Sequence, residues 1–320
     1  MVVVFPPMDL DLLPPHLRNV PEDLRDLVLA VRDPAAGFFG PGSRSWRHLR
    51  ENTIQLAGPA AALMQVAHPM VARGVAQHSN FRGDPIGRLQ RTFVAVHRIV
   101  FGPVDKALEA AMGTRRIHER VRGSLAEDAG PAHPAGAAYH ANRPDLLLWV
   151  HATLVDGAID ANERFVGPMP LDERRALYEE MKISGRLFGV AAADLPPTWD
   201  DFHDWYRHQV ENVLFVTDDA RAIADAIVWR AGWYRAASPL ILLLASGLLP
   251  PVVREQFRLP WNGVMEIALG ELEKRYRQAR VVLPPGLLYR KAYLRGLSRT
   301  GASLPHVPGR PLDPLWPRVA

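Results

Sequence analysis

The stretch VAQHSNFRGDPIGRLQRTFVAVHRIVFG, residues 75–102, is apolar with helical spacing at both ends and carries charge and imidazole in its middle. Residues 86–101 predict one helix, because apolar side chains recur there every three or four positions. Arg88, Arg91 and Thr92 share one narrow face of that helix, and most of the rest is apolar. We interpret this polar stripe as facing an anionic group inside the protein. The alternative is a surface helix whose arginines lie in water.

The same helical spacing extends over nearly the whole chain. Strand-like alternation is almost absent, and the runs VVVF at the N-terminus and VVL at 281–283 are too short to build a sheet. We therefore predict a single all-α domain, with no linker that would divide it. Separated by proline and glycine, the predicted helices cover residues 21–32, 44–68, 70–78, 86–101, 104–126, 145–157, 171–188, 199–215, 219–235, 239–249, 262–280 and 286–298.

The composition excludes several classes of protein. The 320 residues contain 38 Lys and Arg against 34 Asp and Glu, a net charge of +4 without a basic block, so nothing favours nucleic-acid binding. There is no cysteine, which removes disulfides, thiolate nucleophiles and cysteine-bound metal or haem. The N-terminus lacks the basic start of a signal peptide, and the most apolar run, 239–253, is too short to span a membrane. We expect a cytoplasmic protein, with peripheral membrane contact as the alternative.

Motifs of common enzymes are also missing from the sequence. The chain has no glycine-rich dinucleotide motif, no P-loop, no G-x-S-x-G nucleophile elbow and no H-E-x-x-H zinc motif. No histidine follows a glutamate at a spacing of three, which is the ligand pattern of di-iron helix bundles. Twelve histidines and the carboxylates remain as candidates for metal chemistry.

Four predicted helical segments each carry a histidine in apolar surroundings, namely His68, His78, His118 and His151. Any one of them, taken alone, is most simply a hydrogen-bonded core or surface residue. His151 in particular needs a partner or a ligand, because burying it unpaired is costly. A haem needs an apolar slot, an imidazole for its iron and arginines for its propionates, and these residues fit that need. A mononuclear metal or a structural polar network would fit them too.

The order and spacing of these residues resembles the DUF2236 family, which contains the latex-clearing rubber oxygenases and the oxygenase of mycophenolic acid biosynthesis. The resemblance covers roughly residues 45–260. The motifs that carry it are, in chain order, Gln65-x-x-His68-Pro69, His78-Ser79-x-Phe81-x-x-Asp84-Pro85-x-x-Arg88-Leu89-x-x-Thr92, His118-x-x-Val121-x-Gly123 and Tyr139-x-Ala141-x-x-Pro144-x-Leu146-x-x-Trp149-Val150-His151.

The resemblance implies an all-α fold with a globin-like core around haem b. It implies that His118 is the iron ligand, that Arg88 and Thr92 lie beside the haem, and that dioxygen is used to cleave double bonds of isoprenoid chains. By the same resemblance, residues 45–260 form the haem-binding oxygenase domain. Residues 1–44 add an N-terminal extension with the first helix. Residues 261–320 add C-terminal helices and a Pro/Gly/Arg-rich tail packed on the same domain.

The sequence departs from the rubber oxygenases at two places. Arg91 stands where they have a lysine before the threonine; an arginine stays protonated and cannot bind iron, but it can bind a propionate or polarise dioxygen. Residues 54–87 contain no glutamate, the residue type that serves as acid and base in rubber cleavage. The polar groups available there are Gln65, His68 and His78. These departures argue against rubber-type cleavage and leave the expectation of haem unchanged.

We therefore predict a haem b-dependent oxygenase that acts with dioxygen on a hydrophobic substrate, isoprenoid or lipid-like. The alternatives are a non-catalytic protein that binds haem or a hydrophobic ligand, and a helical scaffold whose histidines are only core residues. His118 is the predicted iron ligand. Catalytic roles are predicted for His68, His78 and Thr92, and further cofactor contacts for Gln65, Arg88, Arg91, Thr92 and His151.

Overall fold

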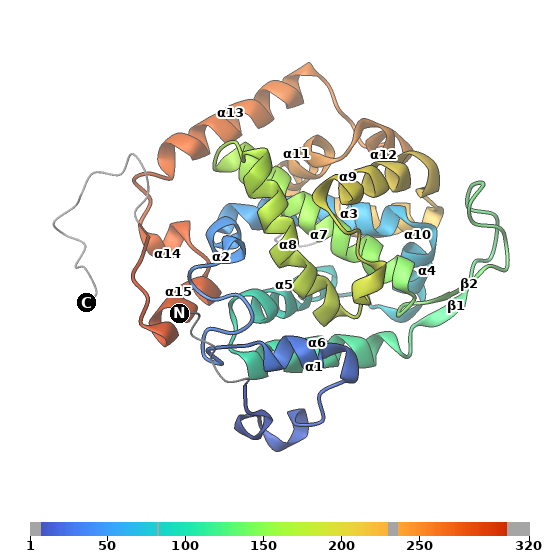
Figure 1. Ribbon diagram of the computed structural model, residues 1–320. Coiled ribbons are helices and arrows are strands. Elements are labelled where there is room, and N and C mark those ends of the chain that lie inside the picture. Colours follow the sequence, from blue (N-terminus) through green and yellow to red (C-terminus); the bar gives the residue numbers. More distant parts are fainter. Residues whose placement is uncertain (1–7, 82, 230–235, 306–320) are drawn as a thin grey trace.

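The computed structural model describes residues 8–81, 83–229 and 236–305, with the backbone alone for Pro85, Ile86, Arg88 and Leu89. The described chain is mostly helical, as predicted, and includes one small two-stranded sheet (Figure 1). Its α-helices are α1 (Glu22–Leu29), α2 (Arg44–Leu49), α3 (Gly58–Ala67), α4 (Pro69–His78), α5 (Pro85–Phe101), α6 (Val104–His118), α7 (Pro144–Phe165), α8 (Leu171–Phe188), α9 (Trp199–His208), α10 (Asp218–Val228), α11 (Ser238–Leu248), α12 (Pro251–Gln256), α13 (Gly263–Ala279), α14 (Pro285–Leu288) and α15 (Lys291–Thr300).

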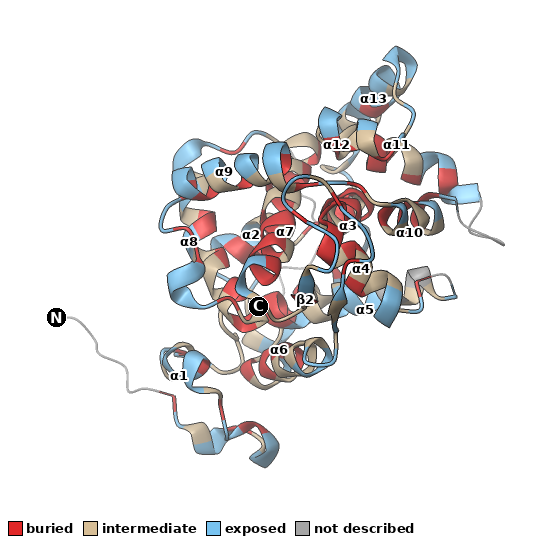
Figure 2. Ribbon diagram, turned by 90° about the vertical axis from the view of Figure 1, so that its right-hand side faces the viewer, coloured by how far each residue is buried: buried red, intermediate tan, exposed pale blue. Residues whose placement is uncertain are grey.

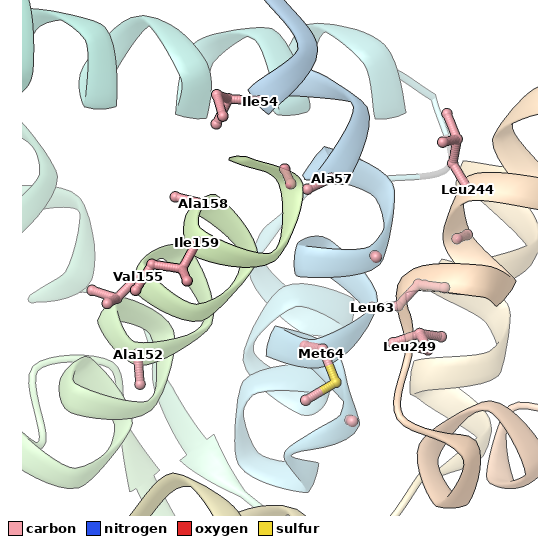
Figure 3. Close-up of a cluster of buried hydrophobic side chains, with 14 of the residues drawn as sticks. Ile54, Ala57, Leu63, Met64, Ala152, Val155, Ala158, Ile159, Leu244 and Leu249 are labelled. Carbon is pink, nitrogen blue, oxygen red and sulfur yellow. The ribbon is translucent and has the colours of Figure 1, made fainter. Parts of the chain in front are cut away.

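Helices α3 and α7 form the centre of the molecule, and both are largely buried (Figure 2). They pack against each other and against the 3-10 helix η3 (Asn52–Ala57), which leads into α3. Each fully buried leucine in such a core contributes about 1.5–3 kcal/mol relative to an exposed one. Figure 3 shows part of this core, where α11 closes one side of α3; the labelled side chains are Ile54, Ala57, Leu63, Met64, Ala152, Val155, Ala158, Ile159, Leu244 and Leu249.

Polar caps fix where two of the helices begin. Asp84 precedes α5, and its carboxylate accepts a hydrogen bond of 2.8 Å from the backbone N–H of Gly87. Thr198 precedes α9 and forms a reciprocal capping box with Asp201. Such caps satisfy backbone N–H groups that have no partner within the helix. The capped start of α5 sets the position of the polar stripe in residues 86–101.

The predicted helix over 104–126 is wrong beyond His118. Helix α6 ends at His118, and the chain continues as strand β1 (Arg122–Ser124), which pairs antiparallel with β2 (Ala138–His140). Gly123 lies opposite Tyr139, and a Cβ at Gly123 would come within 2.8 Å of the Tyr139 hydroxyl. Strands of three residues are too short to show an alternating pattern, so the sequence could not indicate this hairpin, which lies at the edge of the molecule (Figure 1).

Two further predicted boundaries differ from the structure. The helix predicted over 44–68 is divided into α2, η3 and α3. The helix predicted over 145–157 continues to Phe165 as α7 because Gly157, which suggested an end, is instead a packing position. A Cβ there would lie 3.6 Å from the Cβ of Ala61, which is an ordinary van der Waals contact, so Gly157 is a position where α7 faces α3. The predicted helix over 219–235 and the predicted tail over 301–320 lie partly outside the described residues.

Segments from both ends of the chain pack on the same helical body. In the N-terminal part, Asp23 and Asp26 of α1 form ion pairs with Arg115 of α6 and Arg186 of α8. Near the C-terminus, α15 packs on α5, where the Arg299 guanidinium donates hydrogen bonds to backbone carbonyls at positions 35 and 101. None of the helices within the described residues is both long and apolar enough to cross a membrane.

Candidate functional site

A cavity of about 990 Å³, counting the part that opens to solvent, lies between η3, α3, α5, α7 and α8. Its wall is mainly apolar. Helix α5 contributes six residues to the lining, so one face of the predicted 86–101 helix does border this space; they are Thr92, Phe93, Val96, Ile99, Val100 and Phe101. The polar residues of the lining are Gln65, Thr92, His151, Thr153, Ser184 and Arg290.

Several of the residues of η3, α3 and α7 that border the cavity are small, which leaves space beside these helices. Where the chain enters α3, a Cβ at Gly58 would lie 2.5 Å from the ring of Phe93, so this glycine makes room for an aromatic side chain of α5. The other small residues of the lining are Ala57, Ala61, Ala62, Gly157 and Ala158. A concave, mainly apolar space with few polar groups is the usual form of a site for a small hydrophobic molecule.

His151 of α7 lines this cavity and is 1% exposed. Neither ring nitrogen has a hydrogen-bond partner among the described residues, and burial lowers the pKa of the imidazole to about 4. The ring is therefore neutral at physiological pH. Helix α8 passes close beside it, because a Cβ at Gly185 would lie 3.0 Å from both Cδ2 and Nε2 of the ring. A buried polar group without a partner costs free energy, so His151 is a candidate for contact with a ligand.

Gln65 of α3 and Thr92 of α5 line the same cavity. Both residues were predicted from the sequence to belong to the site. The backbone carbonyl of Gln65 accepts a hydrogen bond of 3.3 Å from the Trp149 indole, which ties the end of α3 to α7. The structure thus brings three of the predicted site residues, Gln65, Thr92 and His151, to one cavity.

His118 is the last residue of α6 and does not line this cavity. Its Nδ1 is buried and has no hydrogen-bond partner among the described residues. Burial lowers the pKa of the imidazole, and the side chain of Asn142 opposes that shift. The residue as a whole is partly exposed, and a partly buried imidazole in its neutral form is a chemically suitable metal ligand.

His68 and His78 lie elsewhere. The His68 ring is buried 4.8 Å from the ring of His133, and burial, helped by the charge of His133, lowers the pKa of His68 to about 3. The Nδ1 atoms of both rings are buried without a partner among the described residues. His78 is exposed at the end of α4, where its Nε2 donates to the backbone carbonyl of Arg122 over 3.1 Å.

Of the two arginines in the predicted polar stripe, only Arg91 has a side chain that the structure describes. The Arg91 side chain is 67% exposed and forms an ion pair with Asp84 over 3.0 Å, which also lowers the pKa of that carboxyl group. The Arg88 side chain lies outside the described residues. In this structure Arg91 therefore faces water and its acidic neighbour, which is the alternative that the sequence left open.

Sequence reasoning missed buried Arg290 at the cavity and its partly buried partner His97. Arg290 lines the cavity, and its Nη1 donates a hydrogen bond of 2.6 Å to Nε2 of His97. Burial lowers the pKa of His97 to about 4 and that of Arg290 to about 9, so the histidine is neutral and the arginine charged at pH 7. A signal for His97 was present, because Phe93 and Phe101 flank it at a spacing of four on the apolar face of α5.

Comparisons with known proteins identify two relatives and one protein family. Two relatives, described as uncharacterized proteins of Mycobacterium bovis and Mycobacterium tuberculosis, are each 25% identical over 214 residues, which is 64% of this chain and 80% of theirs. No solved structure matches the chain. A family model described as "ER-bound oxygenase mpaB/B'/Rubber oxygenase, catalytic domain" matches residues 46–282. The chain belongs to this oxygenase family.

Proposed function

We propose that this protein is a haem b-dependent oxygenase that acts with dioxygen on a hydrophobic substrate, isoprenoid or lipid-like. The observation that carries the proposal is the cavity: in a chain of an oxygenase family, a mainly apolar space contains a neutral imidazole, His151, whose two ring nitrogens have no partner in the described residues. A buried site of this kind suits a flat apolar cofactor and an apolar substrate, and haem would supply the activation of dioxygen.

The motif resemblance assigns the iron to His118. The state of this imidazole fits the assignment, because its Nδ1 is shielded from water and its pKa is lowered towards the neutral form that binds metals. Thr92 and Gln65 would contact the cofactor or the substrate from the cavity wall. Arg88 is proposed as the partner of a haem propionate. The globin-like arrangement of the helical core belongs to the same proposal.

His151 is the residue that we propose to hold or transfer a proton near the reacting substrate. It lies in the cavity wall, whereas His68 and His78, the two histidines predicted to be catalytic, lie outside the lining. Arg91, with its exposed guanidinium paired to Asp84, would bind a propionate only at the rim of the site. We further propose that residues 45–260 form the oxygenase unit and that the flanking segments are packed onto it.

A second candidate function is a non-catalytic protein that binds haem or a hydrophobic ligand. One observation favours it: the cavity lining within the described residues contains no carboxylate. Residues 54–87, where rubber oxygenases are expected to hold an acid/base glutamate, contain none either. Acid/base work in this cavity would therefore rest on His151 alone.

The test of the leading proposal is an absorption spectrum, followed by oxygen consumption. Protein expressed with added haem precursor should show a Soret band, and His118→Ala should abolish it. His151→Ala should retain a Soret band when hemin is in excess, with a lower affinity for hemin, and should lose oxygen consumption with a polyisoprenoid substrate. His16→Ala is the matched control, because His16 is an exposed histidine paired with Glu109 on a distant surface.

Each contrary outcome has a definite meaning. A protein that stays colourless when hemin is added would reject the haem proposal. A Soret band that survives His118→Ala and is lost in His151→Ala would move the iron into the cavity, onto His151. Full haem binding without oxygen consumption on isoprenoid or other lipid-like substrates would favour the non-catalytic alternative.

A further inference from the structure

Arg290 places a buried positive charge in the wall of a mainly apolar cavity. The residue is 4% exposed and immediately precedes α15. In the part of the chain that the structure describes, it forms no ion pair. The adjacent buried acid, Glu51, is engaged by Arg280 and by the hydroxyl of Tyr276 instead. The charge of Arg290 is thus left without a carboxylate partner from the protein.

The Arg290 guanidinium donates hydrogen bonds to two neutral groups of the protein. Its Nε donates a hydrogen bond of 3.1 Å to the backbone carbonyl of Glu51, and its Nη1 donates to Nε2 of His97. The His97 ring is itself fixed between Phe93 and Phe101, with ring centroids 6.1 and 6.3 Å away. Because Nε2 of His97 accepts from a cation, the ring is neutral and adds no charge of its own.

This arrangement leaves part of the guanidinium for another partner. Within the described residues, Nη2 of Arg290 makes no hydrogen bond. An uncompensated buried charge is costly, often several kcal/mol, and an arginine fork matches the two oxygens of a carboxylate. The first turn of α15 follows directly, and the N-terminal end of a helix also favours an anion.

We propose that Arg290 binds the carboxylate group of a molecule whose apolar body fills the cavity. This inference rests on the cavity assigned to the proposed function and names the chemistry of its ligand. Two sources would present the same group: a long-chain acid that is the substrate, or a propionate of haem. Arg290 lies beyond residues 46–282, so the oxygenase-family match does not include it. Its contribution comes from the C-terminal part of this chain.

The test uses the purified full chain without haem, together with dodecanoate and dodecanol, which have the same chain length and differ in charge. Calorimetry should show that dodecanoate binds at least about tenfold more tightly than dodecanol, as expected for hydrogen bonds to a charged group. Arg290→Met should remove this preference and leave dodecanol binding unchanged. Arg290→Lys should retain part of it, since the charge remains without the fork.

The matched control is Arg299→Met. Arg299 lies on the same helix and its guanidinium also contacts backbone carbonyls, but it does not line the cavity. This variant should bind both probes like the parent. If Arg290→Met loses its cooperative thermal transition, Arg290→Gln and Arg290→Lys provide the comparison, since both keep hydrogen-bond donors for Glu51 and His97.

A parallel hemin titration distinguishes the two sources. A substrate acid is indicated if Arg290→Met loses the preference for dodecanoate and keeps the hemin affinity of the parent. A haem propionate is indicated if hemin affinity falls about tenfold and the parent shows no preference for dodecanoate. The inference is overturned if a folded Arg290→Met binds dodecanoate, dodecanol and hemin as the parent does. Since the acid arm uses neither haem nor oxygen, a colourless protein that prefers dodecanoate through Arg290 would reject the oxygenase and retain the carboxylate site.

Discussion

Gly185 of α8 lies against the imidazole of His151 so closely that a Cβ at position 185 would be 3.0 Å from two of its ring atoms. The glycine lies in the last turn of an 18-residue helix, where it lowers helix stability relative to alanine by up to about 1 kcal/mol. The position therefore sacrifices helix propensity for the close approach of α8 to His151. The orientation of this ring in the cavity depends on that approach.

Substitution of Gly185 should show how strongly hemin affinity depends on the orientation of the His151 ring. Gly185→Ala would push the imidazole away from α8, and if His151 faces the cofactor, hemin affinity should fall by roughly tenfold, because small displacements at a site are costly. The measurement is a hemin titration followed by the Soret band. Gly270→Ala in α13 is the control, since nothing lies within 4 Å of its Cβ position; it should leave hemin binding unchanged and raise the melting temperature. Unchanged affinity in Gly185→Ala would remove His151 from the cofactor's surroundings.

The buried histidines should make the protein sensitive to acid. Burial lowers the pKa of His68 to about 3 and that of His151 to about 4, whereas both titrate near 6.5 when the chain is unfolded. The unfolded state thus binds more protons below pH 6.5, so stability is full above that pH and falls as the pH drops towards 4. At pH 5 each histidine should cost roughly 2 kcal/mol.

Urea unfolding at pH 7.5 and pH 5 measures this loss. His68→Leu should reduce the difference between the two pH values by about 2 kcal/mol, because leucine does not titrate. His203→Leu, which changes an exposed histidine of α9, should leave the difference as in the parent. Equal acid sensitivity in the parent and in His68→Leu would contradict the buried, neutral state of His68.

Asp156 should destabilise the protein at alkaline pH. Burial raises the pKa of this carboxyl group to about 6, although Tyr206 opposes the shift by hydrogen bonding. The unfolded chain releases the proton of Asp156 near pH 3.8, whereas the folded protein holds it up to about pH 6. The free energy of unfolding is therefore highest at low pH and decreases as the pH rises through 6. Asp156→Asn should therefore be more stable than the parent at pH 8, by up to about 3 kcal/mol, and similar at pH 4. Chemical denaturation at both pH values decides the matter, and a destabilised variant at pH 8 would show that the lost carboxylate contacts outweigh burial.

The buried ion pair between Glu51 and Arg280 should hold the C-terminal segment to the core. Glu51 is 3% exposed, and its carboxylate also accepts from the Tyr276 hydroxyl over 3.3 Å. Glu51→Gln would leave the arginine without its counter-ion, and the free energy of unfolding should fall by about 3 kcal/mol. Glu271→Gln, which removes an exposed ion pair with Lys274, should change it by less than about 0.5 kcal/mol. Equal effects of the two substitutions would argue against a buried pair.

The helical fold could be predicted from the sequence because it is a local property. Apolar spacing placed helices such as α5 and α8 within one residue of their observed bounds, and the motifs identified the family. Gly157 misled the prediction of α7, because a glycine that ends a helix and a glycine that packs against Ala61 look alike in one sequence. The β1–β2 hairpin depends on pairing between segments that have no pattern of their own.

The candidate site could be predicted only in part, for a different reason. The sequence named Gln65, Thr92 and His151, which line the cavity, but it could not indicate that Arg91 would find Asp84 and remain exposed. Nor could it place Arg290, which is 193 residues beyond its partner His97 and reaches the cavity only through tertiary packing. Contacts between helices that are distant in the sequence depend on tertiary packing, so the apolar spacing within one segment cannot predict them.

The small residues around the cavity have a consequence for how binding specificity could change over time. Because Ala57, Ala61, Ala62, Gly157 and Ala158 border the space, its capacity is set by missing side-chain atoms, while the backbone frame around it stays the same. Exchange of a single alanine for valine would shorten or narrow the chamber in increments of one or two methyl groups. Members of the family could therefore share one scaffold and diverge in the length of chain they admit, each by a few substitutions at these positions.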